Sequence, residues 1–279
     1  MPAKQLNFRL KSVFTQSNFS FFEFTSFSMK RLNFTLRTCL IFLLLIPFTS
    51  STFAESPYKK IVYSAFIARD MTKWEELIRT VEASENNKTI EQKLELINYY
   101  YGDIGYLIGK KQYEPAEKLI TKGEKLITEV LQVSPKNATA LSFKGSFLGF
   151  HIGICKYKAV FLGPESKSYI NKAIELDPQN VQGLIDKGNL LFYAPRILGG
   201  DKKEALIYFL KAAGIMERER DTYENWVYLN VLTMIASSYK KDQNLNEAKL
   251  TYEKILGIEP NIVWVKNDLY PKLLAEIKS

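Results

Sequence analysis

Residues 229–262 read LNVLTMIASSYKKDQNLNEAKLTYEKILGIEPNI, and this stretch decides the fold. Its small and apolar residues form two groups on either side of a polar turn, and within each group they recur every three or four residues. That spacing places each group on one face of an α-helix. Pro260 stands near the end, where it stops the second helix from continuing. The stretch therefore predicts a hairpin of two helices.

The second half of this unit recurs along the chain. Small or apolar residues at +4 and +3 spacing are followed five residues later by a proline at three places. The three sets are Gly123, Ile127, Val130 with Pro135; Ser166, Ile170, Ala173 with Pro178; and Ala248, Tyr252, Ile255 with Pro260. A fourth set, Ala205, Phe209 and Ala212, has Glu217 in place of proline. A repeated spacing predicts a repeated structural unit.

Small residues also recur in the first half of each unit. Gly145 lies ten residues after Pro135, and Gly188 lies ten residues after Pro178. Small side chains are needed where two helices approach closely, because a larger side chain would force them apart. The positions expected to carry the repeat are Gly145, Ala173, Pro178, Gly188, Ala205, Phe209, Ala236, Ala248, Tyr252 and Pro260.

With small residues on both helices and a closing proline, the chain resembles a tetratricopeptide-repeat (TPR) protein, whose period is about 34 residues. The resemblance implies an all-α fold, a superhelical stack of antiparallel helix hairpins with a C-terminal capping helix. The repeats are expected over 137–262, with inserts near Phe161–Glu165 and Tyr193–Asp201 that lengthen helices or add structured turns.

The ends are expected to complete the stack. Residues 55–136 are predicted to form N-terminal helical hairpins and a degenerate repeat, with a helix near Lys59–Ala68 and a capping box at Thr72–Glu75 before the next helix. Residues 263–279 are predicted to form the capping helix that covers the last repeat. No segment alternates with a period of two residues, so almost no sheet is expected.

The first 54 residues differ in composition from the rest, since Glu23 is their only acidic residue. From Met29 a basic start precedes an apolar run, Cys39–Phe48, and then a polar stretch with small residues up to Ala54. These features predict a signal peptide at 29–54, cleaved after Ala54, and a periplasmic or secreted protein. An uncleaved anchor is the alternative. Residues 1–28 are expected to be disordered or to be an extension upstream of the true start.

The net charge of +8 belongs mostly to this leader. Residues 55–279 carry 32 basic and 29 acidic residues, or +3. The pairs Lys59-Lys60, Lys110-Lys111, Lys202-Lys203 and Lys240-Lys241 are scattered near predicted helix ends and do not form one basic stripe. We therefore expect no nucleic-acid partner, no membrane-surface role and no membrane span after cleavage.

Catalysis is not expected. His151 is the single histidine, which excludes sites that need two, and a packed, hydrogen-bonded role is the simplest one for it. The chain has no nucleophile motif of the G-x-S-x-G type, no phosphate-binding G-x-x-x-x-G-K-[ST] motif and no clustered metal ligands. The prediction is a protein without enzymatic activity, cofactor or metal.

The segment Leu191–Asp201 is the most distinctive piece of the chain. Pro195 ends one helix, Gly199 and Gly200 permit a sharp or left-handed turn, and Asp201 caps the next helix. It is interpreted either as a shaped turn between helices or as a loop that lines a cleft. With phrases at 225–228 and 264–271, it resembles the T-component partners of tripartite ATP-independent periplasmic (TRAP) transporters. That resemblance implies a small ligand and docking to the transporter's solute-binding protein.

The candidate binding residues are Tyr193, Arg196, Asp201, Trp226 and Tyr228. Buried packing is the alternative for Tyr193, Trp226, Tyr228 and Trp264. Residues 99–101 are three consecutive tyrosines, which point about 100° apart on a helix, so at least one is expected to be exposed.

The leading hypothesis is an exported, non-enzymatic TPR scaffold that binds a protein partner or peptide in the cell envelope, because stacked helical hairpins generate long concave binding surfaces. A TRAP T-component-like protein that binds or passes a small ligand is the alternative. An enzyme of unknown class is the least favoured hypothesis.

Overall fold

A computed structural model describes residues 56–84 and 88–278, all within the structural unit Glu55–Ser279. Within these ranges all regular structure is helical and no strand occurs, as the sequence predicts. The predicted extension 1–28 and signal peptide 29–54 lie outside the described residues.

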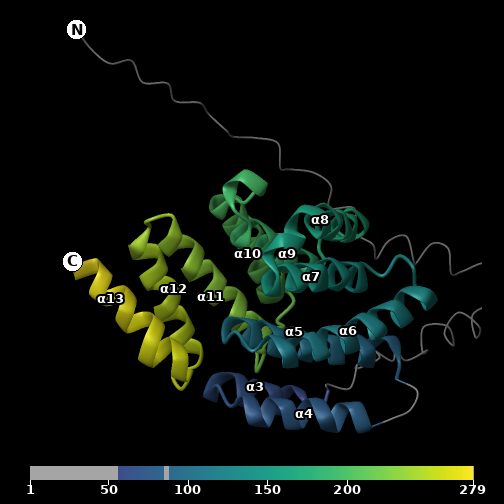
Figure 1. Cartoon of the computed structure of the whole chain (residues 1–279). Helices are drawn as coiled ribbons and strands as arrows, with labels where there is room; N and C mark the ends of the chain where they lie inside the picture. Colours follow the sequence, from purple (N-terminus) through teal and green to yellow (C-terminus); the bar gives the residue numbers. More distant parts are fainter. Residues whose placement is uncertain (1–55, 85–87, 279) are drawn as a thin grey trace, which may run out of the picture. The chain divides into compact units, whose positions relative to one another are not determined.

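The helices follow one another as hairpins whose partners pack together (Figure 1). The hairpins are α3 (Lys59–Ala68) with α4 (Met71–Ala83), α5 (Ile90–Gly109) with α6 (Tyr113–Val133), α7 (Ala138–Ile154) with α8 (Ala159–Leu176), α9 (Val181–Tyr193) with α10 (Lys202–Arg218), and α11 (Trp226–Lys241) with α12 (Leu245–Ile258). A short π-helical segment, Val265–Leu269, then leads into α13 (Tyr270–Lys278), which packs on α12.

The proline-containing connections between successive hairpins, which we call joins, end one helix and begin the next. After Pro135 the side chain of Asn137 accepts the backbone N–H of Ala140 at 2.9 Å. After Pro178 the side chain of Asn180 accepts that of Gly183, also at 2.9 Å. Proline stops one helix, and asparagine satisfies an otherwise unpaired N–H at the start of the next. Two joins of the stack thus follow directly from the sequence.

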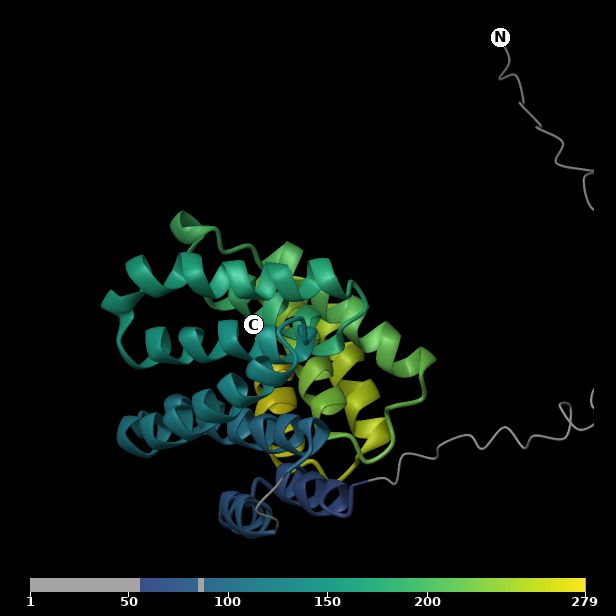
Figure 2. The ribbon, with the colours of Figure 1, turned by 90° about the vertical axis from the view of Figure 1, so that its right-hand side faces the viewer.

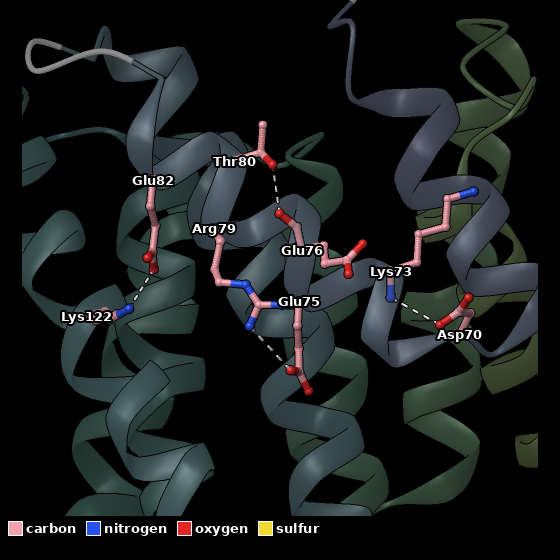
Figure 3. A network of polar contacts seen from close by, with 8 residues as sticks. All are labelled: Asp70, Lys73, Glu75, Glu76, Arg79, Thr80, Glu82 and Lys122. Carbon is pink, nitrogen blue, oxygen red and sulfur yellow. Dashed lines mark hydrogen bonds and ion pairs between the residues drawn. The ribbon is translucent and has the colours of Figure 1, made fainter.

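The predicted capping box at Thr72–Glu75 is wrong. Helix α4 begins at Met71, and its cap is Asp70, whose carboxylate accepts the backbone N–H of Lys73 at 3.1 Å (Figure 3). The reason is the turn just before it: Arg69 adopts a left-handed conformation with φ of 55°, which ends α3 and lets α4 start at once.

The small residues of the repeat lie where the helices of a hairpin meet. A Cβ added to Gly145 would come within 2.7 Å of the backbone oxygen of Ser166, and one added to Gly188 within 2.5 Å of the Phe209 ring. The hydroxyl of Ser166 donates to the Gly145 carbonyl oxygen at 2.7 Å. The predicted close approach of the two helices at Gly145 and Gly188 is therefore confirmed.

The first insert lengthens a hairpin, as expected. Helices α7 and α8 have 17 and 18 residues and are joined by a 3₁₀ turn at Lys156–Lys158. Pro164 lies within α8, in the stretch where the sequence places the insert.

The second insert forms a structured turn. Helix α9 ends at Tyr193, a 3₁₀ turn spans Arg196–Leu198, and Gly199 is left-handed with φ of 85°. Asp201 then caps α10 by accepting the N–H groups of residues 203 and 204 at 2.9 and 3.0 Å. The roles predicted for Gly199 and Asp201 are therefore confirmed.

The first hairpin also contacts the far end of the stack. The ring centroid of Phe66 on α3 lies 5.6 Å from that of Trp226 on α11, 5.5 Å from that of Trp264 and 6.4 Å from that of Trp74 on α4. Trp74 meets Trp226 edge to face at 5.0 Å. All three tryptophans of the chain therefore meet around Phe66, and we call these four residues the aromatic closure.

Polar contacts tie the first hairpin to the second. The carboxylate of Glu82 on α4 accepts the Tyr100 hydroxyl of α5 at 2.6 Å and pairs with Lys122 of α6 at 2.8 Å (Figure 3). Burial alone would raise the pKa of Glu82, but the hydrogen bonds from Lys122 and Tyr100 outweigh it and lower the pKa. Glu82 is thus an ionised anchor between three helices.

Candidate functional site

The first helices of successive hairpins lie side by side, since α5 contacts α7 and α7 contacts α9. In TPR stacks these helices form the concave surface available to partners. We call the corresponding side of this stack the inner face. It is defined by Asn98 and Tyr101 of α5, Ser142 of α7, Gln182, Asp186, Asn189 and Tyr193 of α9, and Asn230 and Met234 of α11.

A hydrogen-bond network around Asp186 joins three of these helices. The Tyr101 hydroxyl donates to one carboxylate oxygen at 2.9 Å, and the Ser142 hydroxyl donates to the other at 2.6 Å. Gln182 donates to the first oxygen at 3.0 Å, and Asn189 donates to the Tyr101 hydroxyl at 2.7 Å. Tyr101 therefore links α5 to α9, two hairpins further along the stack.

Burial controls the charge of this network. It raises the pKa of Asp186 to about 6, against hydrogen bonds from Ser142, Gln182 and Tyr101 that lower it. Burial and the nearby carboxyl group of Asp186 raise the pKa of Tyr101 well above its usual value. Both oxygens of Asp186 already accept donors, so the network fixes the spacing of α5, α7 and α9.

The inner face opens beyond this network, at the end of α9. Tyr193 lies seven residues after Asp186, on the same face of the helix, and is 70% exposed. Its hydroxyl lies 3.9 Å from the sulfur of Met234 on α11. Met234 itself is buried in the core, so the surface exposed at this point is the ring of Tyr193.

Asparagines add hydrogen-bonding groups along the same face. The amide oxygen of Asn98 is buried and has no hydrogen-bond partner within 56–84 and 88–278. Asn189 lies one turn before Tyr193, and Asn230 lies one turn before Met234. Each primary amide offers both a donor and an acceptor, which is the pattern that a peptide group presents. The oxygen of Asn98 is buried and Asn189 already donates to the Tyr101 hydroxyl, so only part of this capacity is open on the inner face.

The structure separates the five predicted site residues. Tyr193 and Arg196 are exposed, and Asp201 is exposed with its carboxylate engaged as the cap of α10. Trp226 and Tyr228 are buried: Trp226 belongs to the aromatic closure, and the Tyr228 hydroxyl donates to the carboxylate of residue 217 at 2.6 Å. Three of the five thus lie at one turn, whereas the other two lie in the core.

None of the three consecutive tyrosines is exposed, so that expectation is wrong. Tyr99 and Tyr100 are buried, and Tyr101 is half-buried with its hydroxyl on Asp186. Helix α5 packs against α4, α6 and α7, which together cover most of its circumference.

The inner face as a whole is not anticipated from the sequence. A usable signal is present, because the polar residues 182, 186 and 189 and the tyrosine at 193 recur at helical spacing along α9. The partners of that row on α5 and α7 carry no such signal, since they are distant in sequence.

The described residues offer little for other chemistry. Within them no group of three His, Cys, Asp or Glu side chains is placed to hold a metal ion. The Nε2 atom of His151 lies 3.0 Å from a carboxylate oxygen of Glu124, which confirms the expected hydrogen-bonded histidine. No helix in the same part of the chain is long and apolar enough to cross a membrane.

One family model and several solved structures resemble this chain, and two of the structures are described below. Residues 229–262 match the family model described as tetratricopeptide repeat. A thermophilic TPR protein of Thermus thermophilus has a TM-score of 0.52 at 13% identity, covering 78% of this chain and 97% of that one. The HusA haemophore of Porphyromonas gingivalis has a TM-score of 0.52 at 14% identity, covering 67% of this chain and 94% of that one. No curated protein sequence matches the chain.

At these identities the two structures are relatives in fold alone. The family match falls on the unit that the sequence pattern singles out, and hairpins of the same kind continue along the rest of the described chain. The chain therefore carries a tetratricopeptide repeat at 229–262 within a TPR-like stack of helical hairpins.

Proposed function

We propose that this protein is an exported, non-enzymatic scaffold that binds an extended segment of a protein partner along the inner face of α9 and α11. TPR domains generally mediate protein–protein interactions. The single observation that carries the proposal is Tyr193, an exposed aromatic side chain that contacts Met234 of the next hairpin. Tyrosine is among the residues that most often dominate the binding energy of an interface.

The surroundings of Tyr193 support a peptide as the ligand. Asn189 can pair with a backbone amide, and the exposed ring of Tyr193 can pack against an apolar side chain. Arg196 begins the exposed 3₁₀ turn that follows α9, where its guanidinium can bind a carboxylate of the partner. A segment with one apolar and one acidic side chain would use all three groups.

Export is the second half of the proposal. It rests on the basic start, the apolar run Cys39–Phe48 and the small residues before Glu55, all outside the described residues. Cell fractionation tests it directly. We expect the mature protein in the periplasm or medium with Glu55 as its first residue, and a cytosolic, uncleaved protein would refute the exported role.

Binding is tested by replacing Tyr193 with a photo-crosslinking amino acid in the full chain and irradiating the cell-envelope fraction. We expect a defined crosslinked partner at this position. As the matched control, the same amino acid at Tyr223, which is 74% exposed but lies between α10 and α11, should give no such product. Equal products at both positions would refute the inner face as the binding site.

A small ligand, which the resemblance to TRAP T-components also implies, is the competing outcome. One structure of similar fold is named a haemophore, so haem is the natural ligand to titrate against this chain. A change in the haem absorption spectrum that Tyr193→Ala abolishes would replace the protein partner with a small molecule. We expect no change that depends on Tyr193.

A further inference from the structure

Three of the turns within hairpins gather at one end of the stack. Helices α5, α7 and α9 all end on the same side (Figure 2). Two contacts confirm that neighbouring turns meet: a Cβ on Gly153 of α7 would lie 3.5 Å from Ile108 of α5, and Lys203 pairs with Asp242 at 3.4 Å. Figure 2 shows the α5–α6, α7–α8 and α9–α10 turns on its left-hand side. We call residues 109–114, 155–161 and 194–203 the turn edge.

The turn edge is basic. It holds seven basic residues, Lys110, Lys111, Lys156, Lys158, Arg196, Lys202 and Lys203, and two acidic residues, Glu114 and Asp201. The joins at the opposite end, 134–137, 177–180 and 219–225, hold two basic residues, Lys136 and Arg220, and four acidic residues, Asp177, Glu219, Asp221 and Glu224. The formal charges are therefore +5 and −2. Asp242 of the neighbouring α11–α12 turn offsets only Lys203, so the two ends of the stack differ in sign.

The same edge exposes large apolar side chains. Ile197 is 91% exposed, Tyr157 is 90% exposed and Phe161 is 81% exposed. Tyr157 and Ile197 lie on the two 3₁₀ turns, and each of those turns also carries exposed basic residues. Between the α5–α6 and α7–α8 turns lies a hollow lined by residues 113 and 153–157. Apolar side chains gathered and exposed in this way mark a surface that contacts a protein or a membrane.

We propose that the turn edge binds the surface of an anionic membrane. Tyr157, Phe161 and Ile197 enter the boundary between headgroups and acyl chains. The exposed cations of the edge bind the anionic headgroups, namely Lys110, Lys111, Lys156, Lys158 and Arg196, whereas Lys202 donates to backbone carbonyls of residues 192 and 194. The apolar side chains sit on separate turns at one end of the stack and do not line one groove. A bilayer accepts such separate insertions at a common depth, with the surrounding cations at the level of the anionic headgroups.

The sequence predicts no membrane-surface role, because its lysine pairs are scattered along the chain. The tertiary structure reverses that expectation, because it brings two of the pairs to the same edge. Along the chain, Lys110-Lys111 and Lys202-Lys203 are far apart and form no basic stripe. In the folded protein both pairs stand on the turn edge, as does Lys156 beside Tyr157. Each such cation near an anionic surface strengthens binding by about fivefold.

Vesicle sedimentation of the full chain tests the proposal. The vesicles are pure phosphatidylcholine or phosphatidylcholine with one part in about three of phosphatidylglycerol. We expect binding to the anionic vesicles that weakens with added salt. The double variant Phe161→Ser/Ile197→Ser should bind about tenfold more weakly or worse, because two inserted side chains are lost. Lys156→Ala/Lys158→Ala should also weaken binding, and only on anionic vesicles.

The matched control uses the opposite end of the stack. Val133 and Tyr223 are both 74% exposed and lie next to or within the joins there, so Val133→Ser/Tyr223→Ser removes similar exposed apolar surface. The apolar run Cys39–Phe48 is common to all variants, so only differences between variants report on the turn edge. Equal binding by wild type and the Phe161/Ile197 variant, or an equal loss in the control, would overturn the proposal.

A fluorescent reporter gives a second, local readout. The native tryptophans all lie in the aromatic closure, and none belongs to the turn edge. A tryptophan introduced as Tyr157→Trp should shift to shorter emission wavelength on anionic vesicles, because its ring enters a less polar medium. Tyr223→Trp should not shift. No shift at position 157 would overturn insertion of the turn and leave the edge to a protein partner.

Discussion

The interfaces within the hairpins and the aromatic closure hold the same stack by opposite means. At Gly145 the helices of one hairpin touch because a side chain is missing, so the backbone of Ser166 comes close. At Trp226 distant helices touch because the side chains are large, so that rings from α3, α4 and α11 fill the gap between them. The first kind of contact fails when volume is added, and the second fails when volume is removed.

The largest expected effect comes from removing volume at the closure. Trp226→Ala deletes the ring that contacts Phe66 and Trp74, and such a truncation of a buried aromatic residue costs about 3–5 kcal/mol. Urea denaturation measures the change. Tyr228→Phe is the control, because it removes only a hydroxyl from the same helix. A loss below about 1 kcal/mol for Trp226→Ala would mean that the closure does not hold the first hairpin.

The second-largest effect on the free energy of unfolding is expected when volume is added within a hairpin. The new methyl group of Gly145→Ala would lie 2.7 Å from a backbone oxygen, so α8 must move, and overpacking of this kind costs about 1–3 kcal/mol. Gly149→Ala in the same helix meets no atom within 4 Å and should gain up to about 1 kcal/mol from helix propensity. Equal effects of the two substitutions on the free energy of unfolding would contradict the close approach.

Asp103 makes the region beside the closure sensitive to pH. It follows Gly102, which lies against Trp74 and Trp226, and one of its carboxyl oxygens has no hydrogen-bond partner within the described residues. Burial raises the pKa of Asp103 from 3.8 to about 7, and the nearby charge of Glu75 adds to the rise. The folded protein therefore holds this proton more tightly than the unfolded chain, and stability falls as pH rises from about 4 to 7.

Asp103→Asn tests that dependence because asparagine cannot ionise. We expect the variant to be more stable than wild type at pH 8, and the difference to shrink or reverse at pH 4. Urea midpoints of both proteins at the two pH values measure it. Parallel pH profiles of wild type and variant would show that Asp103 is not the titrating group.

The smallest effect is expected in the turn that follows α9. Asp201→Ala removes the cap of α10 and should cost about 1 kcal/mol, since two N–H groups lose their acceptor. Arg196→Ala in the same turn removes an exposed side chain and should change stability by less than about 0.5 kcal/mol. Thermal denaturation of both variants measures the two values. An equal loss for both would imply that Arg196 also supports the turn.

The predictable part of the fold consists of contacts between residues close in sequence. Pro178 and Asn180 mark a join that the structure reproduces, and Asp201 caps the helix that the sequence assigns to it. Thr72 shows the limit of such patterns: its capping motif is present, but Asp70 caps the helix because the chain turns at Arg69. Two nearby residues could each cap this helix, and the geometry of the preceding turn decides which of them does.

The candidate site is less predictable than the fold. The unusual segment around Tyr193 indicates that residue, but its neighbour Met234 lies on another hairpin, 41 residues away. Trp226 and Tyr228 are candidates by their chemistry, and both are buried in the core. A residue type indicates what a side chain can do, whereas the packing of helices around it decides whether a partner can reach it.

The sequence by itself determined the helices, their pairing into hairpins and their order, because these depend on periodic apolar residues, small residues and prolines within about 34 positions. Only the tertiary structure decided which hairpins meet across the stack. Tyr101 bonds to Asp186 over 85 residues, and Tyr63 donates to Glu259 over 196 residues. Those contacts depend on small rotations between successive hairpins, which accumulate along the stack and leave no periodic trace in the sequence.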